Sequence, residues 1–375
     1  MKIGIAAFPY DNGKSGIWSY IKNIITDISK IDENNEYYIF TPYDFKLKRI
    51  NVKQILFKSP RINHPIVNIL WHQVYLFYAV KRFGIDLLHL PAGNRRLLLF
   101  RPCKIVTTIH DLSQFHVKGK YDRLRMFYVK RILPLFINNV DKIITVSDST
   151  KKDIIDCWGV KDISITVLPN GIPGDLAGKK IDEKKKEDVL GKYKISGKYI
   201  FYVSRLEHPG KNHVMLIKAY SKFREETGLL HKLVLAGSDW TQADMIYEEA
   251  KKSKFFEDIV FTGYAPEEDL PYLYKGSDLF VFPSLYEGFG IPILEAMAFG
   301  TPVICSNLSS MPEVLGDCGL TFDPEDLNAI KEKIRIMLTD NGLRDRFIKK
   351  GLDRIKLFDW ENIALRTAKI YEQLR

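Results

Sequence analysis

Cysteine is scarce in this chain. Its 375 residues include four cysteines, Cys103, Cys157, Cys305 and Cys318. They lie far apart in the sequence and form none of the paired spacings that bind structural zinc. Apolar neighbours such as Ile304 favour burial of some of these thiols. The pattern predicts reduced cysteines, as in a cytoplasmic protein, and we expect no metal site.

Long apolar runs are also missing. No stretch reaches the roughly 18 uninterrupted apolar residues that mark a membrane-spanning helix. The nearest, 66–80, contains His72 and Gln73 and predicts an amphipathic helix. Residues 1–8 are too short an apolar run for a signal peptide, and they predict a first buried strand. We expect a cytoplasmic location, with at most a peripheral contact on the inner face of the cell membrane.

Two common nucleotide-binding patterns are absent as well. The loop 12–16 has the sequence Asn-Gly-Lys-Ser-Gly, which lacks the earlier glycine of a P-loop. No complete Gly-x-Gly-x-x-Gly follows the first strand, and this disfavours a dehydrogenase. No RNA-recognition fingerprint or zinc-finger pattern is present, so nucleic acid is not the expected partner.

Acidic residues are sparse in the first half. Residues 1–172 have 26 Lys and Arg against 14 Asp and Glu, a net of +12, whereas the remainder has 30 against 32, a net of −2. Such asymmetry predicts an anionic partner, which is membrane lipid, a pyrophosphate-linked acceptor or nucleic acid. A merely soluble surface explains scattered lysines but explains this asymmetry less easily.

The basic residues cluster most densely between positions 118 and 131. Aromatic residues are interleaved there, and Asp122 is the one acid. Cations with aromatic residues on a helix suit a bilayer interface or single-stranded nucleic acid. A solvated helix face with a buried apolar side is an equal alternative. The cations are Lys118, Lys120, Arg123, Arg125, Lys130 and Arg131.

Short apolar runs alternate with helical patterns along both halves of the chain. This rhythm predicts parallel sheets with helical crossovers, in two Rossmann-like lobes. Ligands of such sheets bind at the carboxyl ends of the strands. The turn 168–171 and the charged run 179–188 place a linker near 171–196. The expected strands are 3–7, 37–40, 87–90, 104–108, 142–146, 199–203, 232–236, 259–262, 279–282 and 302–305.

The most informative pattern lies between Glu287 and Glu295. A buried strand ends at Pro283, a glycine loop follows, and Pro292 suits the first turn of a helix. Gly288 and Gly290 allow a ligand to approach the backbone, and the helix start offers free N–H groups to a phosphate. Glu287 is placed to accept sugar hydroxyls, and Glu295 to reach a ribose. On its own this pattern is also compatible with an ordinary loop and a glutamate that favours the helix dipole.

A second loop carries cations after a predicted strand. Arg205 and Lys211 follow the strand 199–203. An Arg fork and a Lys point charge on one loop suit a diphosphate. Taken alone, two exposed cations are the simpler interpretation.

The string from Leu285 to Val303 resembles the signature of the family 4 retaining glycosyltransferases, also called group 1 glycosyltransferases, which have the GT-B fold. The resemblance extends over nearly the whole chain. It implies two Rossmann-like lobes that face each other across a cleft. It also implies an acceptor-binding domain in 1–172, a nucleotide-sugar-binding domain in 173–357, and a terminal helix in 358–375 that crosses back onto the first domain.

The resemblance also implies roles for single residues. His110, Glu287, Arg205 and Lys211 match the catalytic positions, and Asp111 is a candidate acceptor contact. Two positions depart from the family pattern, because Ser15 and Asn212 stand where glycine is usual. The implied donor-binding residues are Gly16, Gly288, Phe289, Gly290 and Glu295, and the candidate acceptor or membrane contacts are Asp111, Arg123, Arg125, Lys130 and Arg131.

The implied activity is transfer of a hexose from a nucleotide-diphosphate sugar with retention of configuration. GDP-mannose is the first expectation for the donor, and a saccharide or polyprenyl-pyrophosphate-linked saccharide for the acceptor, in synthesis of bacterial surface polysaccharide such as lipopolysaccharide. Neither a cofactor nor a metal is expected. The alternatives are a phosphorylase or sugar epimerase of the same architecture, and a nucleic-acid-binding protein.

Overall fold

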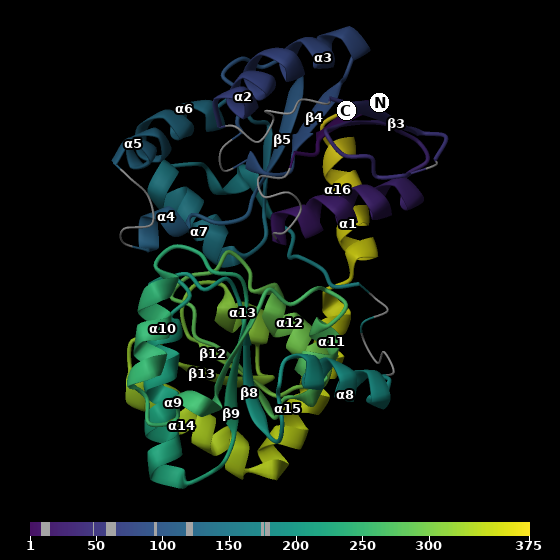
Figure 1. The fold of residues 1–375 in the computed structure, drawn as a ribbon. Helices are drawn as coiled ribbons and strands as arrows, with labels where there is room; N and C mark the ends of the chain where they lie inside the picture. Colours follow the sequence, from purple (N-terminus) through teal and green to yellow (C-terminus); the bar gives the residue numbers. More distant parts are fainter. Residues whose placement is uncertain are drawn as a thin grey trace. The chain divides into compact units, whose positions relative to one another are not determined.

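The computed structural model describes residues 1–8, 16–47, 49–57, 65–93, 96–117, 123–173, 176 and 181–375, without the side chains at positions 65, 66, 124 and 125. The chain divides into two compact units. Unit 1 comprises Met1–Gly171 and Phe358–Arg375, and unit 2 comprises Ile172–Leu357. Each unit is a sheet covered by helices (Figure 1). Residues 12–15, Lys118, Lys120 and the side chain of Arg125 lie outside the described part.

Unit 1 is built on a parallel sheet. Among the described residues, seven strands pair in the order β3-β2-β1-β4-β5-β6-β7. Ile3 of β1 lies opposite Tyr37 of β2 on one side and Leu87 of β4 on the other. The strands are β1 (Lys2–Ala6), β2 (Glu36–Thr41), β3 (Val52–Leu56), β4 (Leu87–Leu90), β5 (Lys104–Ile109), β6 (Lys142–Thr145) and β7 (Ile165–Val167).

The helices of unit 1 cover both faces of this sheet. Successive residues of a strand point to opposite faces, so Ile105 and Val106 of β5 belong to two different cores. On one face lie Trp71, Leu133 and other residues from the segments after β3 and β5. The helical segments are α1 (Gly16–Ile31), α2 (Pro65–Leu70), the π-helix η1 (Trp71–Tyr75), α3 (Leu76–Phe83), α4 (Ser113–His116), α5 (Arg123–Phe127), the π-helix η3 (Tyr128–Ile132), α6 (Leu133–Ile137), α7 (Asp148–Trp158), the 3-10 helix η4 (Asp162–Ser164) and α16 (Trp360–Glu372).

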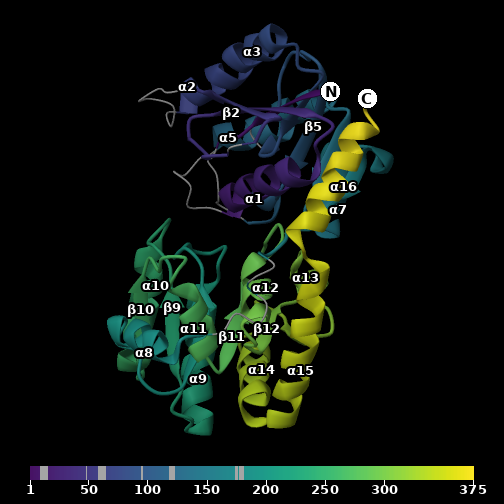
Figure 2. The same ribbon diagram turned by 90° about the vertical axis from the view of Figure 1, so that its right-hand side faces the viewer.

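The last helix, α16, belongs to unit 1. Figure 2 shows it in yellow beside the purple α1, and Trp360 and Tyr371 share a core with Ile21. Gly171 lies so close to Trp360 that a Cβ atom there would come within 2.8 Å of the indole. Only glycine fits this contact without displacement. The terminal helix therefore packs in the first unit, in line with the expected fold.

Unit 2 contains a second parallel sheet. Its six strands pair in the order β10-β9-β8-β11-β12-β13. They are β8 (Tyr199–Val203), β9 (Lys232–Ala236), β10 (Ile259–Gly263), β11 (Leu279–Phe282), β12 (Val303–Ser306) and β13 (Gly319–Phe322). The helical segments are α8 (Glu183–Lys192), α9 (His213–Thr227), α10 (Ala243–Lys252), the 3-10 helix η5 (Phe256–Asp258), α11 (Leu270–Gly276), α12 (Ile291–Ala298), α13 (Met311–Leu315), α14 (Leu327–Thr339), α15 (Asn341–Arg354) and the 3-10 helix η6 (Ile355–Leu357).

Three strands were not predicted from the sequence, namely β3, β7 and β13. All three lie at an edge of a sheet. An edge strand is less buried, so it lacks the continuous apolar run by which the central strands are recognised. In β3, for example, Lys53 and Gln54 interrupt the apolar residues. The expected linker near 171–196 also contains a helix, α8, which belongs to unit 2.

Each sheet has a point where the strand order reverses. In unit 2 the chain runs from β8 through β9 to β10 in one direction, and from β11 to β13 in the other. The reversal point therefore lies between β8 and β11, and the loops that follow these two strands begin there, at the carboxyl ends of the sheet. In unit 1 the corresponding point lies between β1 and β4. Parallel sheets bind ligands at such positions, so the candidate site is sought there.

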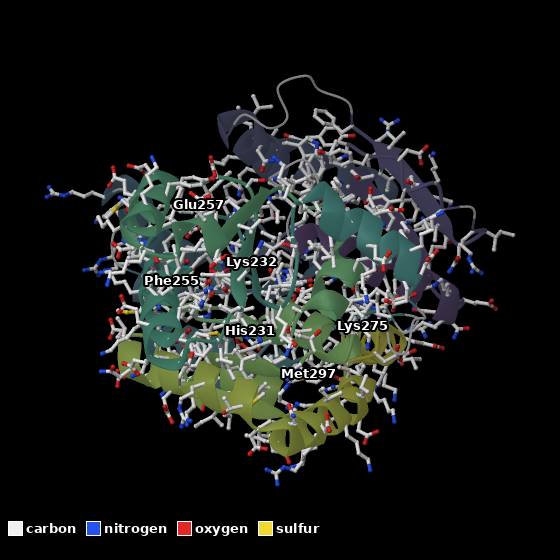
Figure 3. All side chains as sticks on the ribbon, turned by 60° about the horizontal axis from the view of Figure 1, so that its bottom comes forward. His231, Lys232, Phe255, Glu257, Lys275 and Met297 are labelled. Atoms are coloured by element: carbon white, nitrogen blue, oxygen red, sulfur yellow. The ribbon has the colours of Figure 1, made fainter. Side chains whose placement is uncertain are left out.

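At the other end of the second sheet, structural contacts cover the amino ends of two strands, β9 and β10. Arg224 donates to the carboxylate of Asp258 and to the carbonyl of His231, each at 2.9 Å, and it lies over the ring of Phe255. Figure 3 shows His231, Lys232 and Phe255 at this end, where β9 begins. These contacts occupy the amino ends of β9 and β10 with groups of the protein itself.

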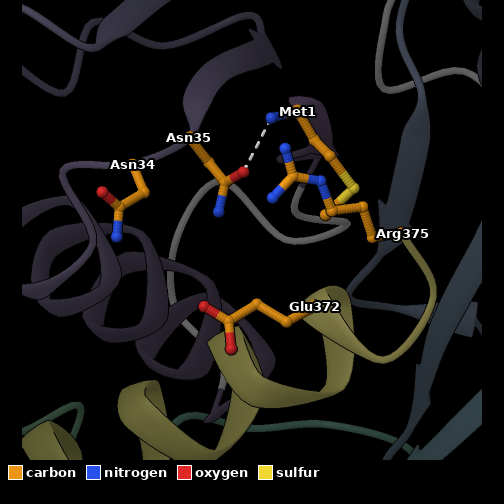
Figure 4. A pocket seen from close by; sticks show the side chains of 5 residues that line it. All are labelled: Met1, Asn34, Asn35, Glu372 and Arg375. Atoms are coloured by element: carbon orange, nitrogen blue, oxygen red, sulfur yellow. Dashed lines mark hydrogen bonds between the residues drawn. The ribbon is translucent and has the colours of Figure 1, made fainter.

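A pocket in unit 1 also lies at the amino ends of the strands. It is lined by Met1, Asn34, Asn35, Glu372 and Arg375 (Figure 4). The N-terminal ammonium donates to Oδ1 of Asn35 at 2.8 Å. Met1 stands directly before β1, so this pocket is at the wrong end of the strands for a ligand of this kind of sheet. We place the candidate site elsewhere.

Candidate active site

Two loops meet at the reversal point of the second sheet. The loop after β8 holds Arg205 and Lys211, and the loop after β11 holds Glu287. The backbone N–H of Leu285 donates to the carbonyl of Gly210 at 2.9 Å, which fastens one loop to the other. Lys211 and Glu287, which are 76 positions apart in the sequence, are brought together in this way.

Lys211 and Glu287 form an ion pair at the centre of this arrangement. Nζ of Lys211 donates to Oε1 of Glu287 at 2.7 Å, and the two side chains are only 19% and 15% exposed. A pair removed from water to this extent is screened less by salt than a surface pair. Removing one partner would leave the other charge largely buried and unpaired. The structure thus joins two of the residues that the sequence had singled out.

The backbone around Glu287 is held by two serines that the sequence analysis did not identify. Oγ of Ser309 accepts from the N–H of Glu287 at 3.0 Å and donates to its carbonyl at 2.9 Å. Oγ of Ser310 lies 2.9 Å from that same carbonyl and 2.8 Å from the carbonyl of Phe289. These contacts fix the glycine loop from a segment more than 20 residues away. The only sequence signal was the Ser-Ser pair itself, which is common in loops.

The loops also depend on two left-handed backbone positions. Gly290 has φ 98° at the N-cap of α12, a value that favours glycine. Asn212 has φ 58°, and its Nδ2 donates to the carbonyls of Pro283 and Pro324 at 3.1 and 2.8 Å. Asparagine is one of the few other residues that tolerate this region. Asn212 can therefore adopt the conformation for which the family usually has glycine, and its side chain also fastens the loop.

Arg205 occupies a different environment from Lys211. Its side chain is half exposed, with Nη2 3.6 Å from Oε2 of Glu207 and the guanidinium 4.8 Å from the ring centroid of Trp240. Glu207 and Trp240 thus hold a cation at the rim of the reversal point, while Lys211 lies deeper against Glu287. An Arg fork in this position is available to a diphosphate from solvent.

Glu295 lies in α12, beyond the glycine loop. Its Oε2 accepts a hydrogen bond of 2.7 Å from the hydroxyl of Tyr274. Burial raises the pKa of the Glu295 carboxyl, although the Tyr274 hydrogen bond acts in the opposite direction, and the nearby Glu267 adds to the increase. The carboxyl group is therefore more easily protonated than an ordinary glutamate.

His110 lies in unit 1, directly after β5. Its Nε2 lies 2.8 Å from the carbonyl of Pro91, so this nitrogen carries the proton. The ring packs edge-on against Tyr20, with 4.8 Å between ring centroids. Burial lowers the pKa of His110, while the Pro91 carbonyl and Asp111 act in the opposite direction. The imidazole is thus a neutral group with a fixed orientation.

Other predicted positions have clear local roles. Oδ1 of Asp111 accepts from the backbone N–H and the hydroxyl of Ser113, at 3.0 and 2.6 Å, and so stabilises the start of α4. Ser147 is the N-cap of α7 and accepts from the N–H of Thr150. Gly16 is the first residue of α1. Arg123, Lys130 and Arg131 are exposed on the segment α5–η3–α6.

The second unit therefore offers two cations, a loop carboxylate and a helix N-terminus at the carboxyl ends of β8 and β11. Such a combination can bind a diphosphate and accept hydrogen bonds from hydroxyl groups. Among the described residues, no group of three or more His, Cys, Asp or Glu side chains is placed to hold a metal ion. In the same part of the chain, no helix is long and apolar enough to cross a membrane.

Comparison with known proteins decides the family. The model of Glycosyltransferase Family 4 matches residues 15–175, and that of Glycosyl transferases group 1 matches residues 183–354. O-antigen chain mannosyltransferase B of Escherichia coli is 36% identical over 272 residues, which are 72% of this chain and 71% of that protein. The chain belongs to the group 1 glycosyltransferases. The expected family and the expected kind of enzyme are thereby confirmed.

Other relatives of this glycosyltransferase extend the picture. The serotype-specific mannosyltransferase WbdA of E. coli is 28% identical over 270 residues, which are 70% of this chain but only 32% of WbdA. Among solved structures, a glycosyltransferase from Rickettsia africae has a TM-score of 0.74 at 18% identity and covers 100% of this chain, as this chain covers 98% of it. Anabaena HepE, solved with UDP and glucose, has a TM-score of 0.76 at 19% identity, with 99% of each chain covered. These structures confirm the fold of two Rossmann-like domains.

Proposed function

We propose that this glycosyltransferase transfers mannose from GDP-mannose to a saccharide or lipid-linked saccharide acceptor, with retention of the anomeric configuration, during synthesis of a bacterial surface polysaccharide. The mannose assignment is supported by the two mannosyltransferases of E. coli that match most of this chain. GDP-mannose is the proposed donor because it is a nucleotide sugar that carries mannose.

The contact between Lys211 and Glu287 is the observation on which the proposal rests. Both groups are largely buried at the carboxyl ends of β8 and β11, where a parallel sheet binds its ligand. In the donor complex, Lys211 would bind the diphosphate and Glu287 would accept hydrogen bonds from the sugar. Because the two side chains touch, the reacting bond between sugar and phosphate would lie beside both.

The remaining residues have complementary roles in this proposal. Arg205 would bind the outer side of the diphosphate, and the N-terminus of α12 after Gly290 would add its free N–H groups. Gly288 and Phe289 would line the same loop, and Glu295 would accept from the ribose. His110 would contact the donor sugar, and Asp111 the acceptor. With cations and N–H groups neutralising the leaving group, the reaction would need no metal.

The donor is tested with purified protein and a panel of nucleotide sugars. We expect GDP-mannose to raise the melting temperature more than UDP-glucose does, and slow hydrolysis to release GDP. With a mannose-terminated oligosaccharide as acceptor, NMR of the product should show the α-anomer, the configuration of the donor. Activity should persist in EDTA. Release of nucleotide from UDP-glucose but not from GDP-mannose would contradict the donor assignment, and dependence on added Mn²⁺ would contradict the role of the cations.

A further inference from the structure

Three segments of unit 1 form a helical layer on one face of the first sheet. They are 65–83, which comprises α2, η1 and α3; 96–103; and 123–139, which comprises α5, η3 and α6. Trp71, Leu97 and Leu133 are buried in the same core beneath them. Because all three segments pack inward on one sheet face, their opposite sides form a common outer surface. We call it the outer face, and Figure 1 shows its helices as one layer.

Hydrogen bonds join the three segments into a continuous surface. Nε2 of Gln73, in η1, donates to the carbonyl of Leu97 at 2.9 Å, and Oε1 of Gln73 accepts from the N–H of Leu99 at 3.0 Å. On the other side, Nδ2 of Asn139 donates to the carbonyls of Leu98 and Leu99 at 3.2 and 2.8 Å. The middle segment is therefore fastened to both helical segments.

Large apolar side chains point outward from this layer. Residues 70, 74 and 78 are four positions apart, as are 127, 131 and 135, so each set lies along one side of its helix. Single exposed apolar residues are normal, but a group of them on one surface indicates a contact site. The group comprises Leu70, Val74, Tyr78, Phe100, Phe127 and Leu135, each of which is between 49% and 68% exposed.

The charge of the same segments is entirely positive. Together they contain eight Lys and Arg residues and no Asp or Glu. Six of the cations are exposed, and Arg101 is the one with an ion pair in the described part of the chain, to Asp141 at the rim. The exposed cations are Lys81, Arg82, Arg101, Arg123, Lys130 and Arg131.

We propose that the outer face docks on the surface of a bilayer that contains anionic lipids. Apolar side chains would enter the boundary between headgroups and acyl chains, and the cations around them would lie among the lipid phosphates. A second copy of this chain fits less well, because it would bring two sets of exposed cations together. Single-stranded nucleic acid fits less well too, because bases stack on aromatic rings, and half of the exposed apolar residues are aliphatic.

The test measures binding of the full chain to vesicles by sedimentation. Vesicles of phosphatidylcholine alone are compared with vesicles that also contain phosphatidylglycerol, at low and at high salt. We expect clear binding to the anionic vesicles, with a partition coefficient that rises by about fivefold for each cation in contact. This binding should weaken as salt rises. This measurement does not depend on the proposed donor or acceptor, so it can succeed where the enzymatic assignment fails.

Two sets of variants separate the charges from the apolar groups. The basic set should lose most of the preference for anionic vesicles, and the apolar set should weaken binding to anionic vesicles at both salt concentrations. The basic set is Lys81→Gln, Arg82→Gln, Lys130→Gln and Arg131→Gln. The apolar set is Tyr78→Ser, Phe127→Ser and Leu135→Ser. Because every position is exposed, circular dichroism should show an unchanged fold.

Matched controls carry the same kinds of change elsewhere on the surface, and they should bind vesicles as the wild type does. The control for charge is Lys184→Gln, Lys198→Gln, Lys218→Gln and Lys251→Gln, all exposed in unit 2. The control for apolar groups is Ile163→Ser, Leu230→Ser and Leu357→Ser.

Three results would overturn the proposal. The first is equal binding to neutral and anionic vesicles. The second is a loss in the control sets as large as in the outer-face sets. The third is a dimer in sedimentation velocity, or tight binding of single-stranded RNA, that the outer-face variants abolish while vesicle binding persists.

Discussion

The charged residues at the reversal point of the second sheet differ in how far their side chains are buried. Lys211 and Glu287 are paired and largely buried, whereas Arg205 is half exposed beside Glu207 and Trp240. A charge that has a buried partner affects both folding and ligand binding when it is removed, but an exposed charge affects ligand binding alone. The two loop cations should therefore behave differently under substitution.

Replacing Glu287 by Gln should lower sugar transfer by about 100- to 1000-fold, because a neutral amide accepts weaker hydrogen bonds from the donor sugar and no longer balances Lys211. The rate of product formation checks this. Glu257→Gln is the matched control, since Glu257 is exposed at the opposite edge of the unit (Figure 3). Near-normal turnover of Glu287→Gln would remove this residue from the site.

Lys211→Ala should lower both stability and transfer, whereas Arg205→Ala should lower transfer only. For Lys211 we expect a loss of about 3 kcal/mol of unfolding free energy, because Glu287 is left unpaired. Urea denaturation and initial rates measure the two effects. In a double-mutant cycle, Lys211→Ala should cost less stability in the Glu287→Gln background. Equal costs in both backgrounds would show that the pair is not energetically coupled.

Glu295 should give the second unit a pH-dependent stability. Its carboxyl has a raised pKa, so the folded state binds the proton more tightly than the unfolded state does. The stability difference between the wild type and Glu295→Gln should therefore decline as pH rises above the ordinary glutamate pKa of about 4.3, through the raised value. Urea unfolding across this pH range measures it. A difference that stays constant with pH would mean that the pKa of Glu295 is not raised in the folded state.

At the scale of elements, the apolar pattern predicted the central strands, because burial on both faces of the sheet leaves a continuous apolar run. It missed the edge strands β3, β7 and β13, because an edge strand is less buried and lacks such a continuous run. The candidate site was predicted only as separate loops. That Ser309 and Ser310 hold the backbone of Glu287 and Phe289 depends on how β12 and its following loop lie beside β11, and no local pattern carries that information.

One buried chain of hydrogen bonds links elements at opposite ends of the sequence. The hydroxyl of Tyr371, in α16, lies 2.7 Å from Nδ1 of His89 in β4, and Nε2 of His89 lies 2.9 Å from Oγ1 of Thr108 in β5. Oγ1 of Thr108 is 3.1 Å from the hydroxyl of Tyr20, whose ring packs on His110. Burial lowers the pKa of His89 to about 3, so this histidine stays neutral.

Tyr371→Phe should reduce the free energy of unfolding by about 1–3 kcal/mol, because Nδ1 of the buried His89 loses its partner. Urea denaturation measures the change. Tyr78→Phe is the control, because Tyr78 is exposed in the same unit, and it should change stability by less than about 0.5 kcal/mol. If the two variants were equally stable, the chain of hydrogen bonds would have no net effect on stability.

For the molecule as a whole, charge and fold divide along nearly the same boundary. Unit 1 contains all of the positive excess, and unit 2 contains the loops that match the donor signature. The sequence predicted this asymmetry from composition alone. It did not predict that the exposed apolar residues of 65–83 and 123–139 belong to one layer, because that depends on both segments covering the same face of the sheet.

The position of α16 has a consequence for synthesis of the protein. Unit 1 needs residues 358–375, yet these leave the ribosome only after all of unit 2 has been made. Until then, the side of α1 that packs on Trp360 and Tyr371 has no cover. Domains fold as units during synthesis, so unit 2 can complete its fold first although it comes second in the chain. A nascent chain that stops short of α16 would therefore expose an apolar surface to which chaperones can bind, even after unit 2 has folded.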